Sequence, residues 1–169
     1  FVSGPHIAVI KVNGTIASNT NANGTYITQS LRQAFENEDS SAIVLQINSG
    51  GGSPYHAEMV WNEIQYLKKK YPNKKVYALI EDIGASAAYQ IASASDYIIV
   101  GKTSLVGSIG VIMSNYDVTK LMDKVGVGDR TIVAGSNKAA FSFTQKVTDE
   151  QMAYYQGMLN NVHKNFIQY

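Results

Sequence analysis

The sequence predicts one α/β domain with repeated strand–helix units around a mostly parallel sheet. Hydrophobic runs typical of strands alternate with segments whose apolar residues recur at helical intervals. No internal repeat or proline-rich linker divides the 169 residues, and the composition, 45% hydrophobic and 16% charged, is ordinary for a globular protein. Parallel strands need crossover connections, so we expect the helices to lie against the sheet.

The first hundred residues supply most of the predicted sheet. Asn13-Gly14 gives a turn signal after the first strand, and Lys68-Lys69-Lys70 marks a helix end, where positive charge complements the helix dipole. The predicted strands are 6–12, 41–47, 76–80 and 97–100, and the predicted helices are 26–38 and 57–67.

Beyond residue 100 the pattern is less regular. The apolar run 103–113 is interrupted by glycines, and we expect it to turn and then enter the core. Apolar spacing predicts a helix over 116–125, and residues 130–133 are typical of a short strand. A last helix is predicted from Thr148, which is followed by acidic residues suited to a helix start.

Composition excludes several classes of function. With 14 basic and 13 acidic residues, the total charge gives no nucleic-acid signature. The chain has no cysteine, hence no thiol nucleophile or thiolate metal site, and its three histidines are too scattered for a zinc motif. We therefore expect no metal and no cofactor. No apolar stretch approaches the roughly 20 residues of a membrane helix, so the chain as given is expected to be soluble.

Three glycines, Gly50 to Gly52, connect the second predicted strand to the following helix. Glycines permit positive φ and expose backbone N–H groups. The loop lacks the ending of a Walker motif and the spacing of a dinucleotide fingerprint, so a phosphate role ranks low. It fits equally an oxyanion hole, in which amides face a carbonyl oxygen, and a plain flexible connection.

The segment Gly84–Tyr89 is predicted to form a tight turn from a strand into a short helix, with Ser86 on the turn. A hydroxyl at the start of a helix lies near free N–H groups and the positive end of the dipole, which suits a nucleophile. The alternative is that small residues are there only to allow close packing of helix on sheet.

A serine nucleophile needs a base, and none of the three histidines stands beside a motif that would orient it. Lys138 lies among small, largely apolar residues, and desolvation there would favour the neutral amine that can accept a proton. A surface loop lysine is the alternative interpretation of Lys138.

Several of these motifs together resemble the signal peptide peptidase A family of serine proteases, which have the ClpP/crotonase-like fold. The resemblance covers almost the whole chain, and Lys138 follows Ser86 at the spacing the family has. The segments that carry it are Val12-Asn13-Gly14-Thr15-Ile16, Leu45-Gln46-Ile47-Asn48-Ser49-Gly50-Gly51-Gly52, Ala85-Ser86-Ala87-Ala88-Tyr89, Gly107-Ser108-Ile109-Gly110-Val111 and Gly135-Ser136-Asn137-Lys138.

The resemblance implies a serine endopeptidase with a Ser–Lys dyad. Ser86 would be the nucleophile, Lys138 the base, and Ser108 the residue that orients the lysine amine. The amides of Gly52 and Ser53 would form the oxyanion hole. Expected substrates are hydrophobic peptides, chiefly signal-peptide remnants.

The resemblance also implies partners and a location. We expect a homo-oligomeric ring whose active sites are shared between neighbouring subunits. The full-length protein would be associated with a bacterial inner or cytoplasmic membrane through an N-terminal anchor absent from this chain. Residues 1–169 would then be a single soluble protease domain that also lacks a C-terminal extension.

The sequence departs from the family pattern at three positions. Gly50 stands where the family has proline, and Ala87 and Ala88 replace two glycines, which adds two methyl groups where a substrate backbone would approach. Two alternatives stay open. A crotonase-type acyl-CoA enzyme would use the glycine loop but leave Ser86 and Lys138 without a role, and a non-catalytic scaffold would keep the fold for assembly only.

Overall fold

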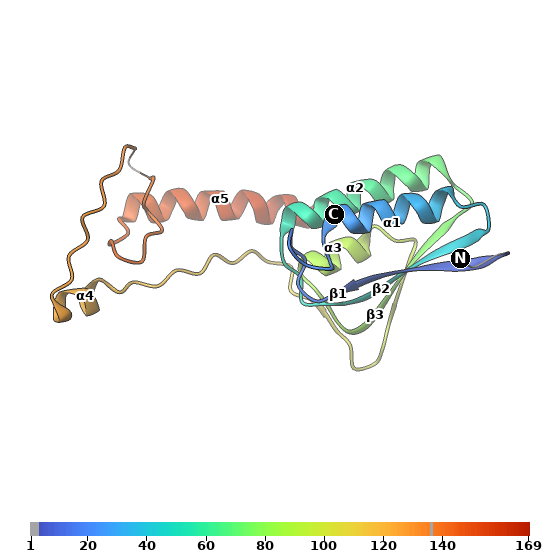
Figure 1. Cartoon of the computed structure of the whole chain (residues 1–169), viewed down its shortest axis with the longest axis horizontal. Helices are drawn as coiled ribbons and strands as arrows, with labels where there is room; N and C mark the ends of the chain where they lie inside the picture. The colour runs from blue at the N-terminus through green and yellow to red at the C-terminus, as the bar shows by residue number, and fades with distance from the viewer. Residues whose placement is uncertain (1–3, 136) are drawn as a thin grey trace. The chain divides into compact units, whose positions relative to one another are not determined.

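The chain divides into two units, residues 1–109 with Tyr169 and residues 110–168. The computed structural model shown in Figure 1 describes residues 4–135 and 137–169. That residues 1–169 form one protease domain stays a prediction.

A five-stranded parallel sheet forms the centre of the first unit. Its strands β1 to β4 are adjacent in chain order, and β5 pairs in parallel with the carboxyl end of β3. This confirms the predicted sheet and its four strands. The strands are β1 (His6–Asn13), β2 (Ser40–Ser49), β3 (Lys75–Ala85), β4 (Tyr97–Val100) and β5 (Leu105–Gly107).

Three helices connect successive strands and cover one face of this sheet (Figure 1). They are α1 (Gly24–Glu36), α2 (Pro54–Lys70) and α3 (Ala87–Ser93). Asn23 begins α1, because its side-chain oxygen accepts a hydrogen bond from the Thr25 amide at 2.7 Å. Ser53 begins α2 in the same way, followed by Pro54, whose fixed φ suits the first helical position.

The hydrophobic core lies between the sheet and these helices. Because side chains alternate along a strand, Ile43, Leu45 and Ile47 of β2 all point to the helical side and are fully buried. Burying one such side chain contributes about 1.5 to 3 kcal/mol. On β1 the exposed positions include Ile7 and Val9, whose exposed fractions are 58% and 55%. Helix residues in the core include Leu31, Val60, Ile64, Leu67 and Ile91.

In residues 110–135 and 137–168, the described part of the second unit, there are two helices, α4 (Thr119–Val125) and α5 (Asp149–Ile167). Thr148 starts α5 with a capping box: its hydroxyl accepts from the Gln151 amide at 3.2 Å, and the Gln151 side chain accepts from the Thr148 amide at 3.0 Å. The predicted helix start at Thr148 is confirmed. No helix in the described parts of either unit has the length and apolar character needed to cross a membrane.

Two expectations for this part of the sequence were wrong, and a third was right except for the start of the helix. The run 103–113 forms the short β5 and turns at Gly107 and Ser108, which have positive φ, but it does not enter the core, and Ile112 is 87% exposed. Residues 130–133 form no strand, because no neighbouring strand pairs with them. The helix expected over 116–125 begins only at Thr119, where the Asp117 carboxylate accepts the Thr119 amide at 2.9 Å.

Candidate active site

The candidate site of the first unit lies where β2 and β3 end. Ser49, the last residue of β2, is paired with Gly84 near the end of β3. The strands are parallel, so the segments that follow them emerge side by side at the same edge of the sheet. One is the glycine loop, Gly50 to Ser53, and the other is the turn at Ser86.

Ser86 occupies a strained turn between β3 and α3. Its φ of 55° and ψ of −125° are unusual for a residue other than glycine, and such a conformation costs about 1 to 3 kcal/mol. Its amide donates to the Gly107 carbonyl at 2.8 Å, and its carbonyl accepts from the Gln90 amide at 3.0 Å. The half-buried hydroxyl has no hydrogen-bond partner among the described residues. The backbone therefore fixes Ser86 while its hydroxyl stays available for chemistry.

The glycine loop packs directly on this turn. A Cβ atom at Gly51 would lie only 2.8 Å from the Ser86 Cβ and from the Ala85 carbonyl oxygen, and Gly51 has φ of 105°. Only glycine therefore fits at position 51. The loop backbone therefore lies in contact with the serine turn.

Gly52 and Ser53 differ in whether their amides are free. The Ser53 amide donates to the Ile16 carbonyl at 2.8 Å, and the Ser53 hydroxyl accepts from the His56 amide at 3.4 Å. The Gly52 amide, on an exposed residue, has no partner within the described part of the chain. Of the two amides predicted for the oxyanion hole, that of Gly52 is free and that of Ser53 is occupied.

Ser108 immediately follows the residue that holds the Ser86 amide. The β5 strand pairs Gly107 with Ala85, so residue 108 leaves the sheet beside the Ser86 turn. Like Ser86, it is a non-glycine residue with φ of 55°, and it is exposed. Its role in orienting a lysine stays a prediction.

The departures from the family pattern leave the Ser86 turn open. Ala87 and Ala88 are buried in the hydrophobic core, so their methyl groups pack under α3 and do not add bulk on the exposed side. A Cβ at Gly50 would make only an ordinary contact, 3.8 Å from the Ile83 side chain. Position 50 therefore has room for a side-chain Cβ atom.

Lys138 belongs to the second unit, where it lies in a turn ahead of α5 and is exposed. Its amide donates to the Gly135 carbonyl at 3.1 Å. The small, uncharged neighbours noted in the sequence do not bury the lysine in this chain. Ser136, within the same motif, lies outside the described residues, and the pairing of Lys138 with Ser86 stays a prediction.

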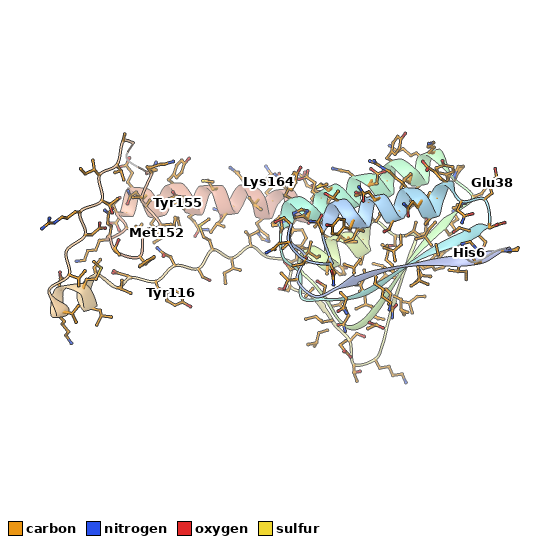
Figure 2. The ribbon with its side chains drawn as sticks, in the orientation of Figure 1. His6, Glu38, Tyr116, Met152, Tyr155 and Lys164 are labelled. Atoms are coloured by element: carbon orange, nitrogen blue, oxygen red, sulfur yellow. The ribbon has the colours of Figure 1, made fainter. Side chains whose placement is uncertain are left out.

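Tyr155 of α5 holds the turn that carries Lys138. Its hydroxyl donates to the carbonyl of Asn137 at 3.0 Å, and its ring contacts Phe141 edge to face, with ring centres 4.2 Å apart. Figure 2 shows Tyr155 near the beginning of α5. The turn is thus anchored on both sides of Lys138 by one aromatic side chain.

Asp129 closes the same segment at its base. One carboxylate oxygen accepts from the Thr131 amide at 2.7 Å and from the Thr131 hydroxyl at 2.5 Å, and the other accepts from the Thr144 hydroxyl at 2.7 Å. These hydrogen bonds, led by that of the Thr131 hydroxyl, favour the charged form and lower the pKa of Asp129 to about 2. Asp129 therefore ties together the two ends of the stretch that contains Lys138.

Sequence reasoning missed three contributors to these arrangements: the buried Ser49, the backbone of Ile16, and Asp129. Ser49 and Ile16 stand inside quoted motifs, but nothing in the motifs shows what they contact. Asp129 had a usable local signal, because Asp-x-Thr also occurs at Asp117, where the carboxylate again accepts from the amide and hydroxyl of the threonine two residues on. Within residues 4–135 and 137–169, no three His, Asp or Glu side chains gather as a metal site.

The chain matches one family model and several curated proteins. The sequence model of Peptidase family S49 matches residues 68–169. The curated relatives include a chloroplastic serine protease SPPA of Arabidopsis thaliana, 29% identical over 137 residues, which are 76% of this chain and 20% of that protein. Another is a Na⁺/H⁺ antiporter NhaA of Brucella melitensis, 35% identical over 81% of this chain but only 18% of the antiporter. The chain thus spans about a fifth of the length of either relative.

Among solved structures, the chain is similar to a membrane-bound stomatin-specific protease in complex with a substrate peptide. The TM-score is 0.51 at 22% identity, and the match covers 69% of this chain and 50% of that one. Together with the parallel sheet, this likeness confirms the predicted ClpP/crotonase-like fold class.

The low pKa of Asp129 predicts an acid-sensitive clasp. A carboxyl whose pKa is about 2 in the folded chain and about 3.9 unfolded stabilises the fold above pH 4 and loses this effect as the pH falls toward 2. Asp129→Asn should therefore lower the melting temperature at pH 5, and the difference from wild type should shrink by pH 2. Asp123→Asn, which removes a carboxylate without a side-chain hydrogen bond among the described residues, is the control. A difference that is independent of pH would contradict the assignment.

Proposed function

Because the chain belongs to Peptidase family S49, we propose that it is a serine endopeptidase whose nucleophile is Ser86 and whose base is Lys138. The observation that carries the proposal is the Ser86 turn. A strained residue with an unpartnered hydroxyl lies against a glycine loop that offers a free amide. This combination supplies a nucleophile and an oxyanion donor within one well-packed unit.

In the proposed reaction, the Ser86 oxygen attacks the carbonyl carbon of the scissile peptide bond while the neutral amine of Lys138 takes the hydroxyl proton. The negative charge that develops on the carbonyl oxygen accepts a hydrogen bond from the Gly52 amide. The carbon–nitrogen bond then breaks, and Lys138 returns the proton to the leaving amine. Water hydrolyses the acyl-enzyme by the same route, with its proton passing to Lys138 and from there to Ser86. Ser108 would orient the lysine amine.

We propose hydrophobic peptides as substrates, in particular signal-peptide remnants, on the resemblance to signal peptide peptidase A and the chloroplastic SPPA relative. Such peptides lie in a membrane, and we place the full-length protein at a bacterial inner or cytoplasmic membrane. Fractionation of cells that express the full-length protein checks this location. The crotonase-type alternative would leave Ser86 and Lys138 unused, and no feature of the site favours it.

Lys138 also bears on assembly. A lysine acts as a base only when its amine is neutral, and desolvation favours the neutral form. In this chain the Lys138 side chain is exposed. We propose that a neighbouring subunit of a homo-oligomeric ring buries the Lys138 side chain. The working site would then combine Ser86 of one copy with Lys138 of another.

The nucleophile is tested by Ser86→Ala. Removal of one hydroxyl at a turn should change stability little, whereas peptide hydrolysis and covalent labelling by a fluorophosphonate should both disappear. Cleavage of a fluorogenic hydrophobic peptide and gel-based labelling are the measurements. Activity that persists in a pure Ser86→Ala preparation would remove Ser86 as the nucleophile.

The base is tested by comparing Lys138→Arg with Lys138→Ala. Arginine keeps the positive charge but remains protonated at every usable pH, so both variants should be inactive. Hydrolysis rates of the three proteins on a fluorogenic hydrophobic peptide are the measurement, and an active Lys138→Arg enzyme would show that Lys138 is an ordinary surface lysine.

The shared site is tested by mixing two inactive proteins. When Ser86→Ala and Lys138→Ala subunits exchange within one ring, some sites regain both an intact serine and an intact lysine. Partial recovery of peptide cleavage is expected, with each variant alone as the control. Mixed rings of verified composition that stay inactive would show that the serine and the lysine of each site come from one chain.

A further inference from the structure

The direction of the free Gly52 amide is set by the residue on the other side of the loop, Ile16. The Ile16 amide donates to the Gly51 carbonyl at 2.9 Å, and the Ile16 carbonyl accepts from the Ser53 amide at 2.8 Å. The Gly51 carbonyl and the Gly52 amide belong to the same peptide group, which is planar and trans, so they point in opposite directions. Because Ile16 holds the carbonyl, the Gly52 N–H points away from Ile16.

The preceding peptide group is held by Ser49. The Gly51 amide donates to the Ser49 hydroxyl oxygen at 3.1 Å, and Ser49 is only 1% exposed. Among the described residues, no other side chain forms a hydrogen bond with the backbone of Gly50 to Gly52. Consecutive glycines would otherwise have wide conformational freedom. A peptide group between two glycines can rotate and turn its N–H to the opposite side, which would remove the donor.

We propose that Ser49 is a positioning residue that, together with the Ile16 backbone, keeps the Gly51–Gly52 peptide in the orientation in which its N–H serves as the oxyanion donor. This inference rests on the proposed peptidase function. Ser49 has no role in the bond-making and bond-breaking steps of the proposed reaction. It acts through Gly51, whose backbone is in contact with the Ser86 turn. Loss of the Ser49 hydroxyl leaves a buried amide without a partner, which favours rotation of the loop.

The test uses Ser49→Ala in the full-length assembled protein, with Ser40→Ala as the matched control. Ser40 is also 1% exposed and lies on the same strand, at the end remote from the loop. For Ser49→Ala we expect kcat to fall about tenfold or more with KM within about twofold, because the donor matters in the transition state. Ser40→Ala should keep the wild-type kcat. Ser49→Cys, which is similar in size but accepts hydrogen bonds poorly, should resemble Ser49→Ala.

A second measurement separates positioning from a general folding defect. A peptide aldehyde forms a hemiacetal with the serine, and the resulting oxygen occupies the oxyanion position. The affinity of the aldehyde for Ser49→Ala should fall in parallel with kcat/KM. A misfolded fraction would instead lower only the number of sites titrated by a fluorophosphonate. Unchanged kcat and aldehyde affinity in Ser49→Ala, or an equal loss in Ser40→Ala, would overturn the role of Ser49. Failure of the peptidase proposal would appear separately, as a wild-type protein that neither cleaves the peptide nor reacts with the fluorophosphonate.

Discussion

The parallel pairing of β2 with β3 is the constraint on which the candidate site depends. Its register sets Ser49 opposite Gly84, so the chain leaves both strands at the same level. The glycine loop and the serine turn are then in contact although they are more than thirty residues apart in the sequence. The buried residues Ile47 and Ile80 hold the register of the regular part of this pairing, because a shift by one residue would turn them away from the core. An irregularity between Ile47 and Ser49 then shifts the pairing and brings Ser49 opposite Gly84.

Much of the first unit could be predicted from local patterns. Strands with buried, alternating side chains and helices with clear caps obey rules that involve near neighbours, and Ser86 was placed correctly at a strand–helix turn. The contacts that position the loop could not be predicted in this way. The hydrogen bonds of Ile16 with Gly51 and Ser53 join segments far apart in the chain. They are formed by backbone atoms, so the residue types at these positions do not indicate them.

The second unit was harder to predict for a different reason. Residues such as Ile112 and Ile132 are apolar, yet they are 87% and 96% exposed. Apolar character predicts burial only where another surface is present to cover it, and helix α5 has no buried residue in this chain. Local hydrogen bonds, such as those of Asp129, therefore hold the structure of this unit more than burial of apolar side chains does.

The backbone at Ser86 shows that the site is a compromise between conformational stability and reactivity. A glycine would adopt φ of 55° without strain, whereas a residue with a side chain is strained there. The most stable residue for this turn is therefore one that has no hydroxyl and performs no chemistry. Ala87 and Ala88 pack in the core beneath α3. The stability of this core allows the fold to tolerate a strained residue at the position where reactivity is needed.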